Sequence, residues 1–393
     1  MQPSGPASLR HLRDTFTRLY GGSPRIFRAP GRVNLIGEHT DYSDGFVMPA
    51  AIGFYTYVAV GPRNDRKLSV HSINFGDAKQ FDLQHISEGP TGHWSDYVRG
   101  VASVLQSNEG PLPGANLLIQ GDVPVGAGLS SSAAIEVASA LALLDNSGVA
   151  LDRLEVALAC QQAEHVYAGT NCGIMDQFIS CFGQANHALR LDCRSLVHQS
   201  LEIDSKVRIV ICNTKVKHEL ASGEYNLRRS ECEAGVRYLK RHLPEIRALR
   251  DVDLEELNRW GTGMPEETYR RCRHVVTENE RVQAATEALE SADLHRFGEL
   301  MAESQRSLRD DFEVSCKELD LMVKLAESSR GVYGARLTGG GFGGSTVNLV
   351  RADAAKKFKQ TIEREYQHAT GVRPDVYVCC AAEGAGEVRD TAT

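Results

Sequence analysis

A dense group of polar residues occupies residues 29–45, between two apolar strand-like runs. In this segment, APGRVNLIGEHTDYSDG, the side chains able to bind or catalyse are Arg32, Asn34, Glu38, His39, Asp41 and Asp44. Gly31 and Gly37 allow tight backbone turns between them. Carboxylates accept hydrogen bonds from neighbouring hydroxyls while arginine and histidine donate them, so this set suits a ligand with many hydroxyl groups.

Two other interpretations of this segment stay open from the residues alone. It could be a solvated loop in which Arg32 and Glu38 form a surface ion pair that contributes roughly 0–1 kcal/mol. Alternatively, Glu38, His39 and Asp41 could bind a metal ion, although the HExxH spacing of a helical metal site is absent.

A glycine- and serine-rich loop, PVGAGLSSSAA at residues 124–134, separates a strand-like run from an apolar helical stretch. Gly126 and Gly128 let backbone amides converge, and three serines open the helix, where unpaired N–H groups and the helix dipole attract anions. Its place between strand and helix favours a phosphate cradle over a flexible turn. It is not the common P-loop, because GxxxxGK[ST] is absent.

A second glycine-rich segment, LTGGGFGG at residues 337–344, has the GxGxxG spacing of a dinucleotide site. That motif must open a helix, whereas the β-like run STVNLV follows here. We therefore expect a turn between two strands whose backbone passes close to another part of the protein, with a plain hairpin as the alternative.

One acidic residue, Asp176, lies among apolar neighbours in GIMDQFIS, and Glu164 precedes it late in a predicted helix. A carboxylate in apolar surroundings is expected to be partly buried and to need a partner, for which Arg32 is a candidate. A helix cap or a structural ion pair is the alternative for Asp176.

The elements that must position these segments follow from hydrophobic periodicity and turn residues. We expect a helix at 11–22 that is closed by Gly21 and Gly22. Strands at 24–30, 46–60, 67–73, 79–83 and 115–121, helices at 130–144 and about 151–168, and a strand at 206–214 follow. The chain is then mostly helical to residue 329, with Thr277 and Glu280 as a capping box. Strands at 331–337, 345–350 and 374–380, a helix at 352–366 and a loose tail from 381 complete it.

Bulk composition narrows the class of protein. The 393 residues are enough for two domains with a cleft between them. The net charge of -7 does not indicate a protein that binds nucleic acid. The ten cysteines form no CxxC pair and are expected to be reduced and mostly buried. No leader pattern and no apolar run of roughly 20 residues is present, so we expect a cytoplasmic protein.

Taken together, PGRVNLIGEHTDY, GLSSSA and TGGGFGG, in this order, resemble the three motifs of the GHMP kinases, and the first is specifically similar to that of the galactokinase branch. The resemblance runs from about residue 25 to residue 350. It implies an α/β fold of the α+β type with two domains, which we place at residues 1–205 and 206–393. The first is a mixed sheet plus helices, the second is ferredoxin-like, and the active site lies between them.

The same resemblance implies the site residues. The sugar-binding positions are Arg32, Glu38, His39, Asp41, Gly173, Asp176 and Tyr225. The nucleotide is expected at Trp94 and Tyr97 near the adenine and at Gly126, Ala127, Gly128, Leu129, Ser130, Ser131 and Ser132 around the phosphates. Ser132 and Glu164 match magnesium positions, and Gly340 and Gly341 lie in the glycine turn that lines the cleft.

The implied reaction transfers the γ-phosphate of ATP to the anomeric hydroxyl of galactose, with Asp176 and Arg32 as catalytic residues and Mg²⁺ as cofactor. The implied partners are galactose and ATP, without nucleic acid or membrane, for a monomer or weak oligomer. A kinase for N-acetylgalactosamine, arabinose or another sugar is an alternative. A non-catalytic sugar and ATP sensor is a second, which the intact serine loop, Glu164 and Asp176 disfavour.

Overall fold

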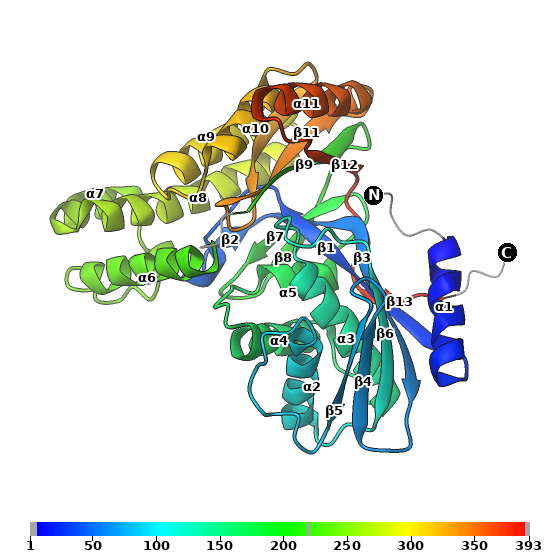
Figure 1. The fold of residues 1–393 in the computed structure, drawn as a ribbon. Helices are drawn as coiled ribbons and strands as arrows, with labels where there is room; N and C mark the ends of the chain where they lie inside the picture. The colour runs from blue at the N-terminus through cyan, green and yellow to red at the C-terminus, as the bar shows by residue number, and fades with distance from the viewer. Residues whose placement is uncertain (1–5, 218–220, 390–393) are drawn as a thin grey trace.

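A six-stranded sheet with the order β13-β1-β3-β6-β4-β5 forms the base of the first half of the structure, a computed structural model that describes residues 6–217 and 221–389 (Figure 1). Strands β4 and β6 run parallel and the other neighbours antiparallel, so the sheet is mixed, as predicted. Its strands are β1 (Arg25–Asn34), β3 (Pro49–Pro62), β4 (Lys67–Ser72), β5 (Asp77–Asp82), β6 (Ala115–Gly121) and β13 (Gly386–Glu387).

Helices cover both faces of this sheet (Figure 1). Helix α1 (Pro6–Tyr20) packs on one face, where Ile26 and Tyr57 are buried, while the neighbouring residues Phe27 and Val58 belong to the core on the other face. This alternation follows from the two-residue period of a strand. The second face is covered by α2 (Asp96–Glu109), α3 (Ser131–Ser147), α4 (Arg153–Ala163) and α5 (Met175–Phe182).

The second half is built on an antiparallel sheet with the order β10-β11-β9-β12. Its strands are β9 (Val207–Lys217), β10 (Val332–Thr338), β11 (Gly343–Arg351) and β12 (Asp375–Cys379), and its helices are α6 (Ala221–Leu239), α7 (Leu254–Trp260), α8 (Glu266–Glu290), α9 (Leu294–Asp310), α10 (Lys317–Glu327) and α11 (Ala355–Thr370). Strand, helices, two strands, helix and strand follow one another along the chain, which is the ferredoxin-like arrangement that we expected.

The two halves share one buried cluster, in which Val33 and Leu35 of the first half lie with Ile209 and Val347 of the second. A small sheet of β2 (Phe46–Val47), β7 (His187–Asp192) and β8 (His198–Glu202) lies at the same junction. The boundary between residues 205 and 206 stays a prediction, and β13 returns from the end of the chain to pair with β1.

Several local expectations were wrong. The first helix begins at Pro6 rather than residue 11, although it ends as predicted, at Tyr20 before the left-handed Gly21 and Gly22. Thr277 lies inside α8 and donates to the carbonyl of Arg273 at 2.7 Å, so it is no helix cap. The tail expected to be loose is ordered to residue 389 through β13, while residues 390–393 lie outside the described residues.

The helix expected at 151–168 is divided. Asp152 and Glu155 form a capping box before α4, and the chain continues from Glu164 to Ala168 as a π-helical turn. Helices α2 and α5 were not predicted at all. The ten cysteines are all free thiols, five of them buried and one, Cys380, exposed. In the described ranges, we find no helix with the length and apolar character needed to cross a membrane.

Candidate active site

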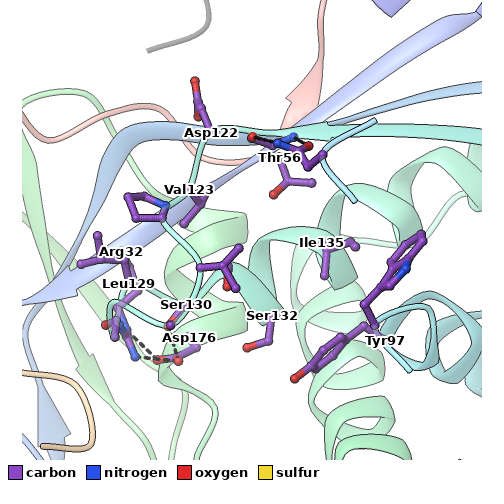
Figure 2. A pocket seen from close by; sticks show the side chains of 18 of the residues that line it. Arg32, Thr56, Tyr97, Asp122, Val123, Leu129, Ser130, Ser132, Ile135 and Asp176 are labelled. Carbon is purple, nitrogen blue, oxygen red and sulfur yellow. Dashed lines mark hydrogen bonds and ion pairs between the residues drawn. The ribbon is translucent and has the colours of Figure 1, made fainter. Parts of the chain in front are cut away.

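A cleft of about 660 Å³ brings the predicted motifs together (Figure 2). Its walls come from β1, the ends of β4 and β6, the start of α2, the loop before α3, the first turn of α5, and the turn between β10 and β11. Residues from both halves of the chain therefore meet at one site, although they are separated by up to about three hundred positions in the sequence.

Arg32 is the central cation of the cleft. Strand β1 continues through Arg32 to Asn34, and Arg32 is only 6% exposed, so the interpretation of this segment as a solvated loop was wrong. Its Nε and Nη2 donate to Oδ1 and Oδ2 of Asp176, each at 2.7 Å, and its Nη1 donates to the carbonyl of Gly128 at 2.6 Å. Arg32 thus joins β1, α5 and the serine loop, as the dashed lines of Figure 2 show for Asp176.

The surrounding carboxylates favour the charged form of Arg32. Burial acts to lower the pKa of Arg32, but the carboxylates of Asp176 and Glu38 outweigh it and raise that pKa. Planar two-bond pairing between guanidinium and carboxylate is a strong hydrogen-bonded geometry. Asp176 therefore has the partner that the sequence predicted, and 20% of its side chain stays exposed.

The serine loop ends at the N-terminus of α3. Ser130 has a left-handed backbone (φ 55°) and its hydroxyl donates to Oδ2 of Asp176, while α3 begins at Ser131. Ser131 and Ser132 line the cleft beside the unpaired amides of the first helical turn, which is a suitable place for phosphate. Ala127 does not line it, because its carbonyl faces the second half and accepts from Ser345 Oγ at 2.7 Å.

The glycine turn packs on that loop, as expected. A Cβ on Gly339 would lie 3.0 Å from the carbonyl oxygen of Gly128, and a positive φ of 85° also favours glycine there. Gly339 and Gly340 of this turn line the cleft, whereas Gly341 of the same turn does not. A Cβ on Gly341 would lie 2.3 Å from the carbonyl oxygen of Val314, so this glycine allows packing away from the cleft.

Glu38 and His39 lie just behind the Arg32–Asp176 pair, buried from solvent. Glu38 Oε2 accepts from the side-chain amide of Asn34, and Oε1 accepts from the backbone amide of Gly339 at 2.5 Å. His39 Nδ1 lies 2.9 Å from the Tyr42 hydroxyl. Burial and the nearby His274 lower the pKa of His39 to about 3, so its imidazole is neutral.

Asp41, Gly173 and Tyr225 complete this region. A Cβ on Gly173 would lie 2.0 Å from Asp41 Oδ2, so only glycine allows the loop before α5 to approach Asp41. Burial and the charge of Asp176 raise the pKa of Asp41 to about 7. The rings of Tyr225 and His39 are 5.5 Å apart. Of the seven predicted sugar-binding residues, all within the described ranges, only Arg32 and Asp176 line the 660 Å³ cleft itself.

Aromatic side chains line the opposite end of the cleft. Trp94 and Tyr97 line the cleft as expected. Figure 2 shows Tyr97 and Ile135 at the end away from Asp176. Trp94 is oriented by a 3.2 Å hydrogen bond from its Nε1 to Asp77 Oδ2. Ser72, Asn74 and Phe75 also line this end and were missed, because nothing in their turn sequence indicates a ligand.

Ser132 and Glu164 have the chemistry expected of magnesium ligands. Glu164 is 7% exposed, and burial followed by the charge of Asp176 raises its pKa to about 7, with the Ser132 hydroxyl acting in the opposite direction. A hydroxyl and a carboxylate beside a phosphate cradle fit a hard divalent cation that also takes phosphate oxygens as ligands. In the part of the chain that the structure describes, no group of three or more His, Cys, Asp or Glu residues is arranged to hold a metal ion. The alternative interpretation of Glu38, His39 and Asp41 as three ligands of one metal ion is therefore excluded.

Family models match three parts of the chain. Residues 14–62 match the galactokinase galactose-binding signature, residues 96–184 the N-terminal domain of GHMP kinases and residues 285–368 their C-terminal domain. The chain is 49% identical over 377 residues to a galactokinase of Chloroflexus aurantiacus, covering 96% of this chain and 97% of that protein. It is 50% identical over 370 residues to a galactokinase of Chloroflexus aggregans, covering 94% and 95%.

Comparison with solved structures also finds a galactokinase. The crystal structure of Lactococcus lactis galactokinase complexed with galactose superposes with a TM-score of 0.93 at 35% identity, covering 97% of this chain and 100% of that one. The mevalonate kinase of Methanococcus jannaschii has a TM-score of 0.67 at 17% identity, covering 92% and 99%, and shows likeness of fold alone.

Proposed function

The chain belongs to the galactokinase family of the GHMP kinases, and from this premise we propose that it transfers the γ-phosphate of ATP to the anomeric hydroxyl of galactose. The observation that carries the proposal is the contact of Arg32 with both Asp176 and the serine loop. One side chain thereby links the proposed base to the proposed phosphate site.

Asp176 acts on the sugar hydroxyl. Its carboxylate lies at the cleft wall with part of its surface exposed, so it can accept the proton of the anomeric hydroxyl as that oxygen attacks phosphorus. Arg32 holds the Asp176 carboxylate in place with two hydrogen bonds and stabilises negative charge on the attacking oxygen. Ser130, which donates to the same carboxylate, fixes its orientation.

The helix α3 N-terminus acts on the phosphates. Its free amides and the loop from Gly126 to Ser132 cradle the phosphate oxygens and offset the charge that spreads over the transferred group. Ser132 and Glu164 would hold Mg²⁺, which supplies further charge compensation when bound. Trp94 and Tyr97 hold the adenine at the far end, which places the γ-phosphate toward Asp176.

Glu38, His39, Asp41, Gly173 and Tyr225 form the sugar side of the site. Neutral His39 offers a donor and Asp41, once ionised, an acceptor at fixed positions, which allows one hydroxyl configuration to be distinguished from its inverted form. Because Gly339 donates to Glu38, the sugar segment and the glycine turn are also mechanically linked.

A panel of sugars with ATP, read by a coupled assay for ADP, tests this function. We expect the highest kcat/KM for galactose over N-acetylgalactosamine, arabinose and glucose. A higher kcat/KM for any other sugar would overturn the assignment of substrate. Binding of galactose without release of ADP would overturn the assignment of catalysis and indicate a sensor.

A further inference from the structure

A buried glutamine bridges two carboxylates beside the proposed metal site. Gln177 follows Asp176 on α5 and is fully buried. Its Nε2 donates to Glu164 Oε2 at 2.5 Å and to Glu136 Oε2 at 3.1 Å. The bridge joins three separate elements, because Glu136 lies on α3 and Glu164 on the π-helical turn after α4.

The chemistry of the bridge fixes the amide in one orientation. A glutamine amide has two N–H donors, and both are directed to carboxylate oxygens. Turning the amide over would place its oxygen against both carboxylates, which is unfavourable. Among the described residues, Gln177 donates to Glu136 Oε2, while Glu136 Oε1 has no hydrogen-bond partner.

Burial of Glu136 needs a reason beyond packing. The proposed chemistry uses Asp176 and Glu164 but does not use Glu136, which is completely buried inside α3. Placing a second acid close to Glu164 destabilises the site, because Glu136 is removed from water and its Oε1 has no hydrogen-bond partner to compensate. What Glu136 provides in return is an anchor for the Gln177 amide.

We propose that Gln177 is a positioning residue, anchored by Glu136, which holds the Glu164 carboxylate toward Ser132 and the phosphate cradle. This inference rests on the proposed role of Glu164 at the divalent cation. Partners of this kind, which contact a metal ligand and not the metal, orient the ligand and commonly contribute 10–100-fold to metal affinity. Glu136 thereby acts on the cation through two intermediate side chains.

Electron paramagnetic resonance of Mn²⁺ binding to the protein–ADP complex tests the proposal directly, without relying on turnover. We expect Gln177→Met to weaken Mn²⁺ binding by roughly 10–100-fold, with little change in the affinity for galactose. Asn348→Leu is the matched control, because it removes a fully buried amide of β11 in the second half of the chain, whose hydrogen bonds go to Val210, Cys212 and Thr346 and not to Glu164. It should lower the thermal midpoint while leaving Mn²⁺ affinity within about threefold.

Two variants of Glu136 keep the test valid if Gln177→Met does not fold. Glu136→Gln retains an oxygen that can accept from Gln177, so Mn²⁺ affinity should stay within about threefold of wild type. Glu136→Met removes the acceptor and should weaken binding by about tenfold or more. Equal effects of the two variants, or no effect of either, would overturn the anchoring role.

Glu164→Gln separates this inference from the function on which it rests. If Glu164→Gln weakens Mn²⁺ binding and Gln177→Met does not, the positioning role is wrong and the metal assignment stands. If neither weakens it, Glu164 is not a ligand and both are wrong.

Discussion

Replacing Asp176 with asparagine tests the proposed base most directly. Asparagine keeps one oxygen that can accept from Arg32, but its amino group meets the second guanidinium donor and the Ser130 hydroxyl. The variant therefore loses a charge-assisted hydrogen bond and leaves Arg32 without its carboxylate. The fold of the cleft should persist, because Arg32 still donates to the carbonyl of Gly128.

The two expected effects of Asp176→Asn differ in size. Losing a general base lowers kcat by roughly 10²–10⁴, which is about 3–5 kcal/mol of activation free energy. Losing one hydrogen bond to a charged group lowers the free energy of unfolding by about 1.5–3 kcal/mol. The stability loss alone leaves the protein folded at 25 °C and cannot account for the loss in rate.

Steady-state kinetics at saturating galactose and ATP measure the first effect, and chemical denaturation measures the second. Calorimetry should show that galactose and ADP still bind. Asp192→Asn is a matched control, because Asp192 pairs with both Nη atoms of Arg250 at similar exposure, 16% against 20%, and does not line the cleft. It should lose stability and keep its rate. Turnover of Asp176→Asn within tenfold of wild type would refute a catalytic role for Asp176.

Three further predictions follow from single contacts and charges. Gly173→Ala should raise the KM for galactose at least tenfold with little change in the KM for ATP, because the added Cβ would meet Asp41 Oδ2 at 2.0 Å. Gly53→Ala is the control and should leave both KM values unchanged, because its added Cβ meets nothing within 4 Å. Equal kinetics of the two variants would contradict this prediction. Galactose affinity by calorimetry should rise by roughly tenfold from pH 6 to pH 8, since Asp41 has a pKa of about 7 and accepts hydrogen bonds only when ionised. Asp41→Asn should abolish that rise, and an unchanged pH profile would exclude Asp41 as its source. Burial alone would raise the pKa of Glu278, but Arg281, His274 and Arg336 outweigh burial and lower this pKa from 4.5 to about 2. Ionised Glu278 therefore stabilises the folded protein fully above pH 4.5, and this stabilisation is lost as the pH falls toward 2. Urea denaturation should show about 3 kcal/mol of acid-dependent stability from this group, largely absent in Glu278→Gln, and an unaltered slope in that variant would argue against it.

Local sequence was enough to predict the form of the three motifs, whereas the reaction followed from the resemblance to the GHMP kinases. The polar segment with Arg32, the serine loop before an apolar helix and the glycine turn between two strands each form from neighbouring residues. Their backbone conformations are set by glycine, by helix ends and by strand periodicity, which act over a few positions. The Arg32–Asp176 pair could also be anticipated, because a carboxylate among apolar residues must find a cation or be neutralised.

Only the tertiary structure decided which way each side chain faces and which segments meet. Ala127 and Gly341 belong to correctly predicted loops, yet neither lines the cleft. Ala127 accepts from Ser345 of the second half, Gly341 packs on Val314, and Glu38 contacts Gly339, three hundred residues away. The Gln177 bridge depends on how α3, α5 and the π-helical turn pack together, and the local sequence of each element does not specify that packing. Such contacts depend on the relative positions of elements that are distant in sequence. A linear pattern of residue types specifies neither the distance between two such elements nor the direction in which a side chain points.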